Sequence, residues 1–133
     1  DALAMFAAAR TALEAVRTAL AALPGVTTCK IGMEDNISPA DYPLIRIVPE
    51  RITPGRPYSN REVELSLYFG APIANSAGLE AVYSALFALE ADIIAAVRVM
   101  GGRYLETITD EDRLPMYKLM VVRAQITAEN PPA

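Results

Sequence analysis

The sequence contains no histidine and no tryptophan, and it has one cysteine among its 133 residues. Because histidine is the commonest general base and a frequent zinc ligand, its absence removes the usual catalytic triads and most zinc sites. The single cysteine, Cys29, has no second cysteine for a disulfide and no histidine to activate its thiol. We therefore predict that Cys29, in the apolar run 26–31, is a small buried hydrophobic residue.

Long apolar runs and clusters of basic residues are missing as well. No charge-free run reaches the roughly 18 residues of a membrane span, and the first residues lack the basic flank and cleavage site of a signal peptide. The chain has 12 basic against 16 acidic residues, for a net charge of −4. Proteins that neutralise DNA phosphates are normally basic. We expect neither a membrane protein nor a nucleic-acid-binding protein, and a setting in the cytoplasm or in a particle assembled there.

Acidic clusters are the remaining candidates for chemistry. Residues 34–36 (Glu-Asp-Asn) and 110–112 (Asp-Glu-Asp) carry the oxygen ligands that Ca²⁺ and Mg²⁺ prefer, but neither has the spacing of a calcium loop. Gly101 and Gly102 follow a predicted helix, whereas a phosphate-binding glycine loop precedes one. We predict no catalytic residue, no cofactor and no metal, and hence no enzyme. A small enzyme or ligand-binding domain with a carboxylate site is the alternative from another functional class.

Two amphipathic helices are predicted within a single domain, residues 1–133. In residues 1–23, apolar side chains recur at steps of three, four or seven, and Pro24-Gly25 ends the pattern. A second helix is predicted from about Ser76 to about Met100, where two glycines stop it. The apolar residues of the first helix are Leu3, Phe6, Leu13, Val16, Leu20 and Leu23.

Between and after the helices the sequence predicts β-strands. Residues 61–69 alternate between apolar and polar side chains, as expected for a half-buried antiparallel strand. In residues 43–52, Pro43 and Pro49 remove backbone donors, which indicates a sheet edge, a bulge, or both. Residues 26–31 and 114–128 are predicted to form two further strands, and residues 104–108 an optional short one. Residues 110–112 are predicted to form an exposed turn. The predicted fold is α+β, in the order α-β-β-β-α-(β)-β, with two helices packed on one face of a mostly antiparallel sheet.

Charged residues around the predicted hairpin indicate an interaction surface. Four arginines recur there at intervals of five residues and are suited to pair with acidic groups on a neighbour, with a solvated edge as the alternative. Two glutamates on the outer face of strand 61–69 supply the opposite charge, so that head-to-tail contacts between copies would close into a ring. The predicted subunit or tube interface consists of Arg46, Arg51, Arg56, Tyr58, Arg61, Glu62 and Glu64.

Three stretches resemble a known family. They are DYPLIRIVPERI (41–52), REVELSLYFG (61–70) after a polar loop, and Gly-Leu-Glu (78–80) at the start of the second helix. Together they resemble the tail terminator, or tail-completion, proteins of long-tailed bacteriophages, over about residues 1–127.

The resemblance implies a virion protein that forms a hexameric ring at the head-proximal end of the tail. Such a ring caps the tail tube, stops its polymerisation and joins it to the neck. The implied partners are other copies of the chain, the tube protein and a neck or head–tail connector protein, while DNA only passes through the lumen. The family has no catalytic residues. Another ring subunit of the neck or head–tail junction is the alternative within the same class.

Overall fold

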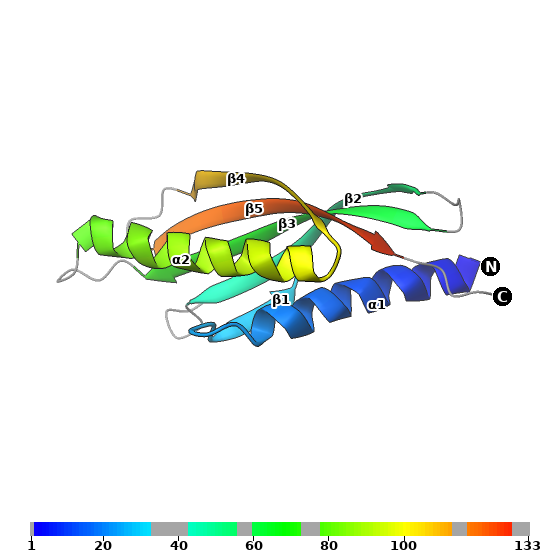
Figure 1. Ribbon diagram of the computed structural model, residues 1–133, viewed down its shortest axis with the longest axis horizontal. Coiled ribbons are helices and arrows are strands. Elements are labelled where there is room, and N and C mark those ends of the chain that lie inside the picture. The colour runs from blue at the N-terminus through cyan, green and yellow to red at the C-terminus, as the bar shows by residue number, and fades with distance from the viewer. Residues whose placement is uncertain (1, 33–42, 56–59, 73–77, 113–116, 129–133) are drawn as a thin grey trace.

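A mixed five-stranded sheet with two helices forms the structure, a computed structural model that describes residues 2–32, 43–55, 60–72, 78–112 and 117–128 (Figure 1). The fold is α+β in the order α-β-β-β-α-β-β, which confirms the predicted class and shows that the optional strand is present. The elements are α1 (Ala2–Ala21), β1 (Thr28–Ile31), β2 (Leu44–Pro54), β3 (Arg61–Pro72), α2 (Gly78–Val99), β4 (Arg103–Asp112) and β5 (Tyr117–Ala128).

The strand order across the sheet is β1-β2-β3-β5-β4. Only β1 and β2 are parallel, with Thr28 opposite Leu44 and Ile31 opposite Ile47, and every other neighbouring pair is antiparallel. The strand with the clearest alternation, β3, therefore lies at the centre and pairs along its whole length with β5. The sequence-based expectation of a mostly antiparallel sheet is confirmed.

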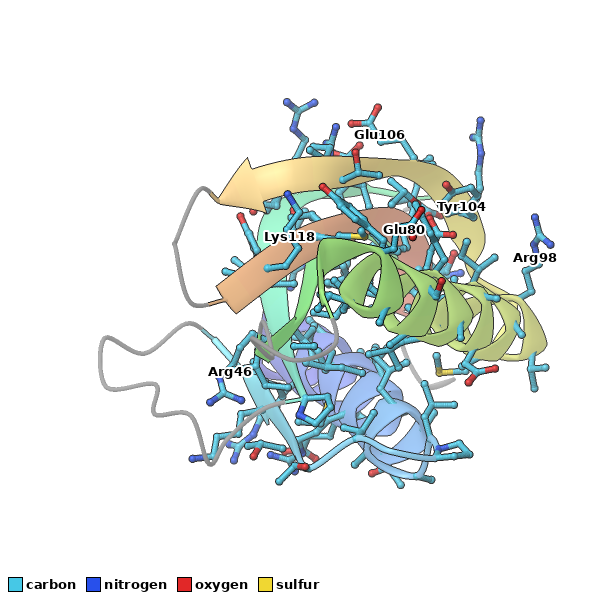
Figure 2. The ribbon with its side chains drawn as sticks, turned by 90° about the vertical axis from the view of Figure 1, so that its left-hand side faces the viewer. Arg46, Glu80, Arg98, Tyr104, Glu106 and Lys118 are labelled. Carbon is cyan, nitrogen blue, oxygen red and sulfur yellow. The ribbon has the colours of Figure 1, made fainter. Side chains whose placement is uncertain are left out.

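Both helices cover the same face of the sheet, as Figure 2 shows. The apolar half of β3 points toward them, and Val63, Leu65, Leu67 and Phe69 are all buried. This arrangement follows from the period of two in a strand, which directs every second side chain to one face. Other residues of this core are Val16, Leu20, Ile45, Ile47, Leu86, Ile93, Val97, Met120, Val122, Ala124 and Ile126.

Two glycines end α2 in a tight reversal before β4. The Gly101 amide donates to the Arg98 carbonyl (3.0 Å) and the Gly102 amide donates to the Val97 carbonyl (2.8 Å), which is the hydrogen-bond pattern of a Schellman cap. Gly101 has φ +78°, a conformation that glycine adopts without steric cost. A Cβ on Gly102 would lie 2.8 Å from Val97 Cγ1. The two glycines therefore have a structural role: they end α2 and allow the chain to reverse so that β4 packs back against the core.

Proline-containing β2 is an interior strand in its first half and an edge strand in its second. Residues 44–47 lie between β1 and β3, whereas no strand among the described residues pairs with the β1 side beyond Ile47. The register with β3 shifts between Pro49 and Arg51, so Glu50 is the extra residue of a bulge. Both sequence-based readings, an edge and a bulge, therefore apply to the second half of β2.

The predicted turn at residues 110–112 is wrong, because β4 continues to Asp112, which lies opposite Leu119. The register between β4 and β5 shifts between Ile108 and Asp112, so the strand accommodates extra residues there. Three consecutive acids are typical of a turn, but pairing with β5 overrides that local preference. Charged residues are also common on edge strands, where they oppose unwanted pairing between molecules.

Candidate interaction surface

The open face of the sheet is the face away from the helices. The β3 side chains on this face are the polar half of the alternating pattern, namely Glu62, Glu64, Ser66 and Tyr68. These side chains alternate with the buried apolar residues of the same strand, so a single sequence pattern produces both the core and this surface.

Neighbouring strands within the same copy already contact the two predicted interface glutamates. Glu62 accepts hydrogen bonds from Gln125 Nε2 (3.1 Å) and Thr127 Oγ1 (3.0 Å). Glu64 lies 3.5 Å from Arg51 Nε, and the Arg51 side chain is 71% exposed. Arg51 and Glu64 were expected to pair between copies, and the structure brings them together within one copy. An exposed ion pair of this kind contributes only about 0–1 kcal/mol to the free energy of unfolding. Either side chain can therefore exchange its partner for one on another molecule at little cost.

A groove of about 340 Å³ lies on the open face between the β2 bulge and β4. The bulge turns Glu50 toward one side of it, and exposed Ile108 lies on the other. Arg123, at the β5 side, is 3.4 Å from Glu106 Oε1 of β4. The residues that line the groove are Glu50, Arg51, Glu64, Ser66, Tyr68, Ile108, Val121 and Arg123.

Sequence reasoning missed Glu50, Ile108 and Arg123 as members of a single surface. Glu50 follows Pro49, and a proline inside a strand was the available signal for a bulge that redirects a side chain. Ile108 and Arg123 come from β4 and β5, whose positions beside β3 depend on the strand order. The groove therefore depends on contacts between distant segments, which no local pattern in the sequence records.

Arg46 departs from the expectation that it lies on an exposed surface with Arg51. Its side chain is only 1% exposed, and it projects from β2 on the side away from the helices (Figure 2). Its Nη1 donates to the carbonyl of Ile45 at 3.5 Å, and its Nε has no hydrogen-bond partner. In this conformation Arg46 cannot pair with a carboxylate on another subunit, because the side chain is enclosed.

The remaining predicted interface residues lie near the outer end of the β2–β3 hairpin. Arg61 is half-buried at the start of β3, and Arg56 and Tyr58 lie outside the described residues. The hairpin is closed by a hydrogen bond from the Gly55 amide to the Asn60 carbonyl (2.8 Å), so residues 56–59 connect the two strands at this end.

Cys29 lies in β1, half-buried and packed against the core. Burial raises the pKa of its thiol from 9.0 to about 11, and the positive charges of Arg46 and Arg17 oppose this shift only in part. Since the thiolate is the nucleophilic form, the thiol is unreactive at neutral pH, in line with the structural role predicted for it.

Metal-binding clusters and membrane-spanning helices are both absent from the part of the chain that the structure describes. Within it, no group of three or more Cys, Asp or Glu residues is arranged to hold a metal ion. None of the helices in these ranges is long and apolar enough to cross a membrane.

No protein-family model matches the chain, and no curated protein matches it either.

Proposed function

We propose that the chain is a structural subunit of a bacteriophage tail that forms a ring at the head-proximal end of the tail tube. The ring stops polymerisation of the tube and joins it to the neck. The observation that carries this proposal is the β2–β3 hairpin, because it contains two of the stretches that resemble tail terminators and extends beyond the part of β2 that β1 covers.

The two stretches form adjacent paired strands. Residues of DYPLIRIVPERI lie in β2 and residues of REVELSLYFG lie in β3, and the strands pair from Leu44 opposite Gly70 to Pro54 opposite Arg61. In the outer half of the hairpin, β2 residues 49–54 are exposed, whereas β3 contributes buried Val63 and Leu65 to the core. An exposed edge strand held against a buried strand is suited to contact another molecule.

The surfaces favour a head-to-tail contact between copies. The open face carries charges of both signs, and the hairpin lies toward one end of the long axis, at the end where α1 begins (Figure 1). A contact between two different surfaces of the same chain is heterologous, and such contacts form a ring when the rotation closes. The net charge of −4 suits a ring through which DNA passes, because like charge repels the phosphates from the wall.

The test is polymerisation of a tail tube protein from the same phage, with and without the purified chain. We expect the chain to shorten the tubes in proportion to its concentration and to appear as a ring at one tube end in negative-stain electron micrographs. An acidic protein of similar size that does not belong to the phage is the control for charge and crowding. Tubes of unchanged length without end rings would contradict the proposal, and binding to the connector but not to the tube would identify a neck ring instead.

A further inference from the structure

We propose that an apolar pocket between α2 and the turn after α1 binds the side chain of a lysine from a different protein. The pocket has a volume of about 200 Å³. It is separate from the open face of the sheet, because α2 and the turn supply most of its walls. The inference goes beyond the proposed function, since it does not depend on contacts between copies of the chain.

The interior of the pocket is apolar. Leu86 and Leu89 of α2 are buried and line it on one side. On the other side lie the turn residues 24–25 and Pro43, which precedes β2. The Thr27 amide donates to the Pro43 carbonyl (2.9 Å), which ties the chain after the turn to the start of β2. The two walls are therefore held by the fold itself, as is usual for sites that are formed before a ligand binds.

Asp92 is the only charged residue among the described residues that line the pocket. It follows Ala88 and Leu89 by four and three residues, so the three side chains share one side of α2. Asp92 is exposed and has no ion pair or hydrogen bond with any residue that the structure describes. The pocket therefore combines an apolar interior with one carboxylate whose charge no described side chain neutralises.

A lysine side chain fits this combination. Lysine buries its aliphatic stem against apolar surface and keeps its ammonium group at the boundary with water, where Asp92 can accept a hydrogen bond from it. Arginine carries more donors, in a rigid planar fork, and Asp92 is the only acidic acceptor that this pocket offers. Charge and shape therefore favour lysine over arginine.

The size of the pocket favours a single side chain over a free metabolite. Sites for small molecules usually enclose about 300–1,000 Å³, and this pocket is smaller. The lysines of the chain are Lys30 and Lys118, and both already have interactions within their own copy. Lys118 is also buried. The lysine that enters the pocket is therefore supplied by a different protein.

n-Butylammonium reproduces the lysine side chain beyond Cα and is the probe for the pocket. Titration into the isotope-labelled chain, followed by NMR, should shift the amides of Gly25, Ala88 and Asp92 in a saturable way. Asp92→Asn should raise the dissociation constant about threefold, as expected for loss of an exposed ion pair. Glu90→Gln is the matched control, because Glu90 is an acid on the same helix that does not line the pocket. Thermal melts confirm that both variants fold.

n-Butanol has the same aliphatic chain without the positive charge. It should bind more weakly than n-butylammonium to the wild type, and Asp92→Asn should not change its affinity. Equal affinity of the two probes for the wild type would overturn the assignment to lysine. Amides around the pocket that show no saturable shift with n-butylammonium would overturn the site itself.

Carbodiimide coupling identifies the source of the lysine in the native assembly that contains the chain. The reagent takes up the water that is lost when a carboxylate and a neighbouring amine form an amide. Mass spectrometry should find Asp92 joined to a lysine of a different protein. Asp92→Asn should remove this product, and Glu90→Gln should retain it.

Two results of the coupling experiment would overturn the proposed partner. One is a product that joins Asp92 to Lys30 of a second copy, and the other is binding of n-butylammonium with no coupled protein. A chain that forms no ring and caps no tube, but binds the probe and gives the expected product, would refute the proposed function and leave this inference intact.

Discussion

Replacing Arg46 by methionine removes a buried positive charge while keeping a long side chain of similar reach. The guanidinium is 1% exposed, its Nε has no partner, and its one hydrogen bond to a described residue is 3.5 Å long. None of the ion pairs between described residues includes Arg46. Lys30, which has interactions of its own, occupies the neighbouring position of β1 and carries a like charge.

The expected increase in the free energy of unfolding follows from these contacts. A buried donor without a partner costs about 1–3 kcal/mol, and like charges on neighbouring strands add up to about 1 kcal/mol. The substitution also removes the hydrogen bond of 3.5 Å, which is near the limit of hydrogen-bond geometry, and this loss lowers the free energy of unfolding by at most about 1 kcal/mol. We therefore expect Arg46→Met to raise the free energy of unfolding by about 1–2 kcal/mol.

Urea denaturation followed by circular dichroism measures this difference. With a slope of about 2 kcal/mol per molar urea, within the usual range for small proteins, the midpoint should rise by roughly 0.5–1 M. Arg51→Met is the matched control, and its exposed side chain should leave the midpoint nearly unchanged. A loss of about 3 kcal/mol or more in Arg46→Met would refute the reasoning, because breaking a buried ion pair has that effect.

Three further changes test the core, the helix cap and the thiol. Phe69→Ala empties a fully buried position on the central strand and should lower the free energy of unfolding by about 3–5 kcal/mol in urea titrations. Gly102→Ala places a Cβ 2.8 Å from Val97 Cγ1 and should lower the melting temperature, and an unchanged melt would show that the cap is looser than described. For Cys29, the raised pKa means that the folded state holds the proton more tightly. The wild type should therefore lose stability relative to Cys29→Ala between about pH 9 and pH 11 and not below, and equal pH profiles would contradict this.

The alternation in residues 61–69 specified much of the fold, because it directs one half of β3 to the core and the other half to the open face. Helix periodicity likewise predicted two helices on one side. The parallel pairing of β1 with β2 did not follow from the sequence, because strand neighbours depend on long-range packing.

Burial of Arg46 was missed because the arginine was interpreted through its charge and its spacing from Arg51. The flanking residues carried a different signal, because Leu44, Ile45, Ile47 and Val48 form an apolar run on both sides of Arg46. Such a run is typical of a strand covered on both faces, and residues 44–47 are indeed all buried. The interface residues themselves remain a prediction, since Arg56 and Tyr58 lie outside the described part and Glu62 and Glu64 are engaged within one copy.

If the chain assembles into a ring, the mass of the purified protein in solution must be several times that of the monomer. Sedimentation velocity over a range of concentrations, with and without tube protein, separates a monomer of 14.3 kDa from a closed ring. We expect one discrete species with the mass of a small ring, the hexamer that the family resemblance implies, and a sharp boundary as expected for closed symmetry. A protein that stays monomeric at every concentration, alone and with tube protein, would contradict it.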